Sequence, residues 1–102
     1  MYTYAISEHA LHDMQSIGDY IAFELCAPES ANALLDLFEQ AFEKACAFPL
    51  SLPLLNDNNL SQKNYRKIIV KNYIIFVIPD EKTETLYIMR ILFHAQNYRN
   101  YL

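Results

Sequence analysis

The chain has a single glycine and no tryptophan in its 102 residues. Phosphate-binding loops need several glycines to let the backbone approach the ligand, so Gly18 alone excludes glycine-rich loops, and no nucleotide cofactor is expected. Cys26 and Cys46 lack CxxC spacing, and the chain has no signal-like start. We therefore expect two reduced thiols in a cytoplasmic protein. No apolar run reaches the length of a membrane span, so no membrane partner is expected.

Positive charge is nearly missing from the first 62 residues. They carry nine acidic side chains and only Lys44, a net charge of −8, whereas residues 63–102 carry seven Lys or Arg and three acids, a net charge of +4. Phosphate and acidic partners are bound by Lys and Arg, so the overall charge of −4 conceals a basic face in the last 40 residues.

Apolar residues make up 53% of the chain, which is above the usual range for a soluble domain. The length fits one domain over residues 1–102, with a single core. The excess of apolar residues predicts either a dense core or an apolar surface that a partner covers.

The first half of the chain predicts a strand and two helices. Tyr2 to Ile6 alternates and is rich in β-formers, and Ser7 is a good N-cap for a helix that runs to about Leu25. In that helix an apolar stripe at helical spacing lies opposite three acids. The stripe is Ala10, Met14, Ile17, Ile21 and Leu25, and the acids are Asp13, Asp19 and Glu24.

A second helix is predicted to begin at Ala27-Pro28-Glu29, because proline and an acid are both favourable in a first turn, and to end before Pro49. The two helices should pack as an antiparallel hairpin. The predicted buried side of the second helix is Ala31, Leu34, Leu35, Phe38, Ala41, Phe42 and Ala45.

The second half predicts an antiparallel β-meander. Leu50 to Gln62 is expected to be a loop because it holds Pro53 and the polar run Asn56-Asp57-Asn58-Asn59. The turn Lys71-Asn72 joins the first two strands, because asparagine tolerates the positive φ of a tight hairpin. The strands are Tyr65–Val70, Tyr73–Ile78 and Leu86–Phe93, with a second turn at Asp80–Glu84 and a terminal helical turn at Asn97–Leu102. The fold class is therefore α+β.

This order of elements, together with several short motifs, resembles the RelE/ParE superfamily of toxins. The motifs are Ser7-Glu8 followed by Ala10 and Asp13, Tyr65-Arg66-Lys67-Ile68, Asn72-Tyr73-Ile74-Ile75-Phe76, and Arg90-Ile91-Leu92 leading to Tyr98. The resemblance covers essentially the whole chain. It implies the toxin half of a bacterial type II toxin–antitoxin module, a growth inhibitor that a small antitoxin neutralises, in a toxin–antitoxin hetero-oligomer.

The superfamily has two functional branches. The RelE-like branch cleaves mRNA on the ribosome and places several basic residues on the sheet. Here only Arg66 matches, because Ile68, Ile74 and Gln96 stand at the other positions. The ParE-like branch binds and inhibits DNA gyrase, and the ending Arg90-Ile91-Leu92-Phe93-His94 is similar to it. We therefore favour gyrase as the target, with ribosome-dependent mRNA cleavage as the alternative.

The motif Arg-Arg-Asp that usually follows this ending is replaced by Ala95-Gln96-Asn97. A further alternative is therefore an inactive family member that acts only as a protein-binding module.

The candidate catalytic residues, if RNA is cut, are Arg66, His94 and Tyr98, since histidine and tyrosine can move protons. His9 and His12 lie beside Asp13, but no third ligand or HExxH pattern accompanies them, so no metal is expected. The candidate contacts for a partner or nucleic acid are Lys63, Arg66, Lys67, Arg90 and Arg99.

Period two in the last strand places Arg90 among apolar neighbours. One face is predicted to hold Ile88, Arg90, Leu92 and His94, and the other Tyr87, Met89, Ile91 and Phe93. We expect Arg90 to be first a structural residue, with its stem on the sheet and its head paired with an acid from a helix or loop. A partner contact is the alternative role.

Overall fold

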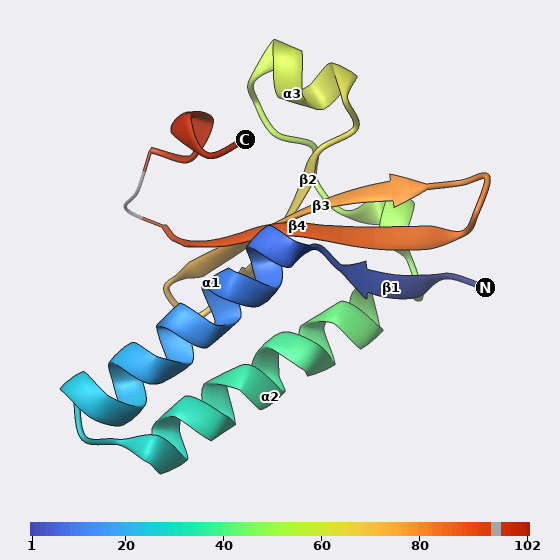
Figure 1. The fold of residues 1–102 in the computed structure, drawn as a ribbon. Coiled ribbons are helices and arrows are strands. Elements are labelled where there is room, and N and C mark those ends of the chain that lie inside the picture. The colour runs from blue at the N-terminus through green and yellow to red at the C-terminus, as the bar shows by residue number, and fades with distance from the viewer. Residues whose placement is uncertain (95–96) are drawn as a thin grey trace.

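The computed structural model describes residues 1–94 and 97–102, and its fold is the predicted α+β arrangement (Figure 1). The sheet has the order β1-β4-β3-β2, with β1 parallel to β4 and the other pairs antiparallel. The elements are β1 (Thr3–Ile6), α1 (Glu8–Asp19), a π-helical turn (Tyr20–Glu24), α2 (Pro28–Ala45), a 3-10 turn (Pro49–Ser51), α3 (Asn58–Gln62), β2 (Arg66–Val70), β3 (Tyr73–Asp80), β4 (Thr85–Phe93) and a 3-10 turn (Tyr98–Asn100). The last turn confirms the predicted helical ending.

Ser7 is the N-cap of α1, as the sequence predicts. Its Oγ accepts a hydrogen bond from the Ala10 backbone N–H at 3.1 Å and donates one to the Met89 carbonyl at 2.9 Å. The cap therefore also fastens the start of α1 to β4. The regular helix ends at Asp19 and widens into the π-helical turn, which is earlier than the predicted end at Leu25. Leu25 is 57% exposed, so its predicted place on the buried stripe is wrong.

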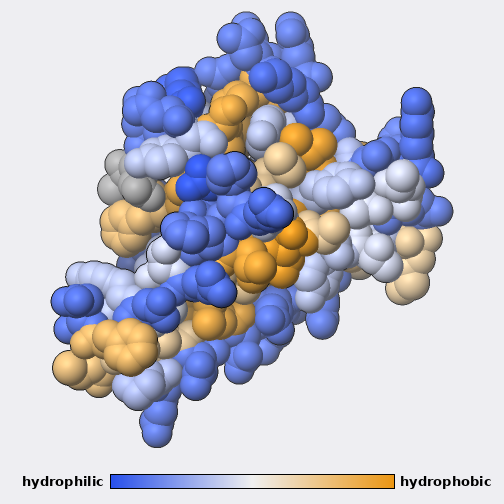
Figure 2. Space-filling model, viewed as in Figure 1, coloured by the Kyte–Doolittle hydropathy of each residue, from blue (hydrophilic) through white to orange (hydrophobic). Residues whose placement is uncertain are grey.

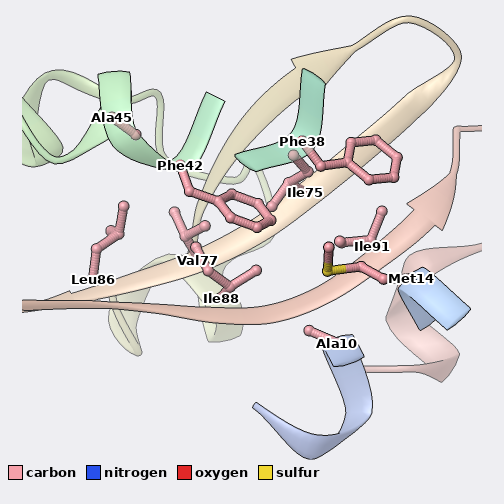
Figure 3. Packing of buried hydrophobic residues seen from close by; sticks show 10 residues of the cluster. All are labelled: Ala10, Met14, Phe38, Phe42, Ala45, Ile75, Val77, Leu86, Ile88 and Ile91. Atoms are coloured by element: carbon pink, nitrogen blue, oxygen red, sulfur yellow. The ribbon is translucent and has the colours of Figure 1, made fainter. Parts of the chain in front are cut away.

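The two long helices pack antiparallel on one face of the sheet (Figure 1). The predicted inward side of α2 is confirmed: Phe38 and Phe42 are fully buried, and the smaller residues on that side are buried or partly buried. Figure 3 shows the side chains of α1, α2, β3 and β4 gathered between helices and sheet. This core cluster is Ala10, Met14, Phe38, Phe42, Ala45, Ile75, Val77, Leu86, Ile88 and Ile91.

The segment predicted as a loop, Leu50 to Gln62, contains more structure than expected. Asp57 caps α3, because its Oδ1 accepts from the N–H groups of Asn59 at 3.0 Å and Leu60 at 3.2 Å. The polar run thus starts a short helix instead of only a loop. Before it, the Lys67 N–H donates to the Pro53 carbonyl at 3.1 Å, so residues 53–55 lie along the first half of β2.

The tight turn between β2 and β3 is present, but its positive φ falls on a different residue. Lys71 has φ 55°, whereas Asn72 is not among the residues with positive φ. The predicted reason for the turn, asparagine in the left-handed region, is therefore wrong. The turn between β3 and β4 uses Glu84, with φ 51°.

A β-bulge in β4 changes which side chains share a face. Phe76 lies opposite Arg90 and Val77 lies opposite Ile88, so Met89 is an extra residue on β4. Ile88 and Ile91 consequently both face the helices and join the same core. The predicted face that groups Ile88 with Arg90 and Leu92 is wrong, because period-two alternation holds only on either side of the bulge.

A second apolar cluster covers the face of the sheet that is turned away from the long helices. Its buried members come from the segment around α3 and from β3 and β4: Leu55, Leu60, Tyr65, Phe76 and Leu92. Tyr98 and Leu102 pack against them. The chain therefore has apolar side chains on both faces of one sheet. Over the described ranges 1–94 and 97–102, no helix has the length and apolar character needed to cross a bilayer.

Candidate functional site

Arg90 and Asp13 form the most buried ion pair among the described residues. Arg90 Nε donates to Asp13 Oδ2 at 2.7 Å and Nη2 donates to Oδ1 at 2.8 Å, and the side chains are 18% and 10% exposed. This fork-to-fork geometry is the strong form of an Arg–carboxylate contact. The hydrogen bonds that Arg90 donates to the Asp13 carboxylate raise the pKa of Arg90 above its ordinary value. The prediction that Arg90 pairs with an acid from a helix is confirmed.

Asp13 is not on the solvent face of α1, where the helical pattern placed it. Asp13 is 9% exposed, and its Oδ2 also accepts a hydrogen bond from the Ile91 backbone N–H at 2.9 Å. The pairing of β1 with β4 ends at Ile6 and Ile88, so the edge of β4 beyond that point needs another hydrogen-bond acceptor. Asp13 supplies this acceptor. The prediction that Asp13 lies on the side of the helix opposite the apolar stripe is therefore wrong.

The C-terminal turn is held by two arginines. Arg90 Nη1 lies 3.5 Å from the Tyr101 carbonyl, and its guanidinium carbon lies 5.2 Å from the Tyr101 ring centre. Arg99 Nε donates to Asp57 Oδ2 at 2.8 Å and lies over the Tyr98 ring. The ring of Tyr98 packs 5.2 Å from Phe76. Residues 97–102 are thereby connected to α1, α3 and the sheet.

Arg66 is also engaged within the chain. Its Nη1 donates to the carbonyl oxygens of Leu50 at 2.9 Å and Leu52 at 2.8 Å, and its Nε donates to Asn64 Oδ1 at 3.2 Å. These bonds fasten the segment after α2 to the start of β2. All three arginines of the chain therefore connect distant segments instead of forming a common basic face.

The three candidate catalytic residues do not converge. Arg66 pairs with Val77, while His94 follows Phe93, which pairs with Tyr73. Four residues along a strand span about 13 Å, so Arg66 and His94 lie near opposite ends of β2.

The other candidate site residues are also dispersed. His94 is exposed and stacks on Phe93, and Tyr98 packs on Phe76. Lys63 is exposed at the end of α3 and Lys67 is half-buried on β2, so they remain candidate contacts. Gln96 lies outside the described residues. In residues 1–94 and 97–102, no three His, Cys, Asp or Glu side chains are placed to hold a metal ion.

The sequence located no apolar surface, but the structure has several. Phe23 at the tip of the helix pair is 74% exposed, and Leu25 beside it is 57% exposed. Figure 2 shows apolar surface at this end of α1. A groove of about 550 Å³ runs from this tip to the end of β4, with the Asp13–Arg90 pair in its wall. The 53% apolar content was the only sequence signal for such surfaces.

We expect Asp57→Asn to loosen the C-terminal turn. The hydrogen bond from Arg99, with those from the backbone N–H groups of Leu60 and Asn59, lowers the pKa of Asp57. A depressed pKa means that this stabilisation is present above the ordinary carboxyl value of 3.8 and is lost as the pH falls through the folded-state value. Hydrogen exchange of residues 97–102, corrected for intrinsic rates, should therefore accelerate in acid in the parent.

In the Asp57→Asn variant the exchange of these residues should be fast already at pH 7 and should change little in acid. Asp36→Asn is the matched control, because Asp36 is exposed and takes part in no ion pair within the described residues. Slow exchange of residues 97–102 in Asp57→Asn at pH 7 would contradict the proposed role of this contact.

Comparison with known proteins gives one family and a related structure. Residues 4–98 match the family model described as the ParE toxin of a type II toxin–antitoxin system. The crystal structure of the RelBE2 toxin–antitoxin complex from Mycobacterium tuberculosis contains a chain with 19% sequence identity and a TM-score of 0.64, and the match covers 93% of each chain. At that identity the likeness shows a shared fold. Among curated proteins there is no significant match.

Proposed function

Because the chain belongs to the ParE family of toxins of type II toxin–antitoxin systems, we propose that it inhibits growth by binding DNA gyrase and that a cognate antitoxin neutralises it. Family membership places it within the RelE/ParE superfamily, as its sequence motifs indicate. We favour a bound protein target over RNA cleavage because of the side chains on the sheet and the contacts of the three arginines.

The observation that carries this choice is the chemistry of the sheet. Cleaving a phosphodiester needs positive charges aimed at the phosphate where negative charge develops. On this sheet, Ile74 and Phe76 of β3 and Leu92 of β4 contribute to an apolar cluster on the face away from the helices. Arg66, Arg90 and Arg99 donate to other parts of the chain. No described constellation resembles a charged cleaving site, which favours inhibition by binding.

The exposed apolar side chains support an antitoxin partner. Phe23 and Phe48 are each 74% exposed and Ile69 is 65% exposed, at three different places on the surface. Large exposed apolar areas are costly in water and mark interaction sites. An antitoxin that extends over the helix pair and the sheet edge would cover them in a toxin–antitoxin hetero-oligomer.

Two assays on the same protein test the proposed target. We expect the purified chain to inhibit supercoiling by DNA gyrase, and we expect transcripts from induced cells to show no new ribosome-linked cuts by primer extension. The chain preincubated with its antitoxin is the control and should leave gyrase active. Cuts that appear within minutes, with gyrase unaffected, would instead place the chain in the RNA-cleaving branch. Normal growth of induced cells would favour an inactive family member.

A further inference from the structure

The two edge strands of the sheet, β1 and β2, each lie beside an apolar groove. Helix α2 contacts both strands, and one groove opens on either side of it. The groove beside β1 has a volume of about 680 Å³, and the groove beside β2 has a volume of about 520 Å³. Their walls are mainly apolar or aromatic: Tyr2, Tyr4, Cys46 and Ala47 beside β1, and Leu37, Ala41, Phe48, Leu52, Ile68 and Val70 beside β2.

The outer side of β1 carries backbone groups that have no partner. The Thr3 N–H donates to the Glu84 carbonyl at 3.1 Å, so this part of Thr3 points toward β4. Backbone groups alternate in direction along a strand. The N–H and carbonyl of Tyr4 and the carbonyl of Tyr2 therefore point away from β4. Among the described residues nothing bonds to these three groups.

The outer side of β2 is open only in its second half. The Lys67 N–H donates to the Pro53 carbonyl at 3.1 Å, so residues 53–55 cover the first half. By the same alternation, the N–H and carbonyl of Ile69 and the N–H of Lys71 also point outward. In the part of the chain that the structure describes, these groups have no acceptor or donor, and Ile69 is 65% exposed.

The two grooves carry opposite charges. Glu43 of α2 lines the groove beside β1, whereas Lys44 of α2 and Lys71 line the groove beside β2. None of these three side chains forms an ion pair within residues 1–94 and 97–102. The amino group of Met1 also lies at the β1 groove, but Glu84 pairs with it. The β1 edge is therefore complementary in charge to the β2 edge of another copy.

We propose that free copies of this chain associate head to tail, with β2 of one copy added to the sheet beside β1 of the next. Both strands run in the same direction as β4, so two copies in the same orientation meet as parallel strands. With Tyr4 opposite Val70 of the second copy, the Tyr4 N–H donates to the Ile69 carbonyl and the Lys71 N–H donates to the Tyr4 carbonyl. The Ile69 N–H then donates to the Tyr2 carbonyl.

The same register joins the two apolar grooves. Tyr2 and Tyr4 of one copy, and Ile68 and Val70 of the other, all pack toward the helices in the structure, so they form one continuous row across the contact. Glu43 then lies on the same side as Lys71 of the second copy, and the two charges attract.

Pairing of two like edges is disfavoured by the same charges. Two β1 edges would bring the Glu43 side chains of both copies together, and two β2 edges would bring their lysines together, which is destabilising. Lysines on an edge strand commonly prevent such pairing, but they do not oppose an edge that offers an acid. Because a head-to-tail contact uses a different surface on each copy, every added copy leaves one edge of each kind free. Association therefore continues beyond a dimer.

Charge-reversal variants test the contact in the free, full-length chain, made by cell-free synthesis and followed by sedimentation over a range of concentrations. The average mass of the parent should rise beyond that of a dimer. Glu43→Lys and Lys71→Glu should each weaken association at least about fivefold. The chain that carries both changes should associate like the parent, because the exchanged charges attract again.

Asp36→Lys and Lys82→Glu are the matched controls, since they reverse exposed charges that line neither groove, and they should leave association unchanged. Urea unfolding checks that each variant is folded. A monomer at every concentration, an association that stops at a dimer, or a double variant as weak as the single ones would overturn the proposal. Neither antitoxin nor gyrase enters this test, so its failure leaves the proposed function intact.

Hydrogen exchange locates the contact. At concentrations at which the chain associates, the amides of Tyr4, Ile69 and Lys71 should exchange more slowly than in dilute solution, because each gains an acceptor. The Lys67 amide is the internal control, because it already donates to Pro53 and should not change. Association without slower exchange of the first three amides would place the contact elsewhere and contradict the proposal.

Discussion

Replacing Arg90 with alanine is expected to lower the free energy of unfolding by about 3 to 5 kcal/mol. Asp13, which is 9% exposed in the parent, would keep only the Ile91 N–H as a partner, so this carboxylate would lose its countercharge. Asp13→Ala should cost a similar amount, because it leaves the guanidinium without its countercharge and the Ile91 N–H without an acceptor. Urea unfolding measures the effect as a lower midpoint at an unchanged slope.

The same experiment separates structural from functional basic residues. Lys67→Ala should shift the urea midpoint little, since Lys67 forms no ion pair within the described residues. The shift for Arg66→Ala should lie between those for Lys67→Ala and Arg90→Ala, because Arg66→Ala removes hydrogen bonds to two backbone carbonyls. A double-mutant cycle with Asp13 isolates the pair. If Arg90→Ala unfolds like the parent but abolishes growth inhibition, Arg90 is a functional contact and its structural role is wrong.

Phe76→Ala is expected to destabilise the chain by about 3 to 5 kcal/mol, as large-to-small changes in packed cores do. Phe76 is 1% exposed and packs against Tyr98 and the α3 segment on the face away from the long helices. If that face were an open binding surface, the same substitution would cost little. The thermal or urea midpoint therefore tests whether this cluster is a true core.

Ile69→Ala is the matched control for Phe76→Ala. Ile69 is an apolar residue of the same sheet but is 65% exposed, so its truncation should change stability by less than about 1 kcal/mol. A similar loss in both variants would mean that the position in the sheet, and not burial in the second cluster, sets the cost. A small loss in Phe76→Ala would contradict the close packing of the second cluster against β3 and β4.

Local signals in the sequence determined most of the elements. The Ser7 cap, Pro28 in a first turn and the helical spacing of Phe38 and Phe42 act over a few residues, so each can be recognised without knowing the fold. The hairpin between β2 and β3 was predicted at the right place but from the wrong turn residue, Asn72 instead of Lys71. Element type is therefore fixed locally, whereas backbone detail at a turn depends on how the two strands twist.

The tertiary structure alone decided the contacts on which the site depends. Asp13 and Arg90 are 77 residues apart, and a helical pattern places Asp13 with the polar residues because it contains no information about the edge of β4. The bulge at Met89 reverses the faces of the last strand, which strict period two cannot anticipate. The sequence thus determined a helix pair, a meander and an excess of apolar residues. Packing between segments far apart in sequence decided which charges are paired within the chain. The same packing decided which grooves remain open to a partner.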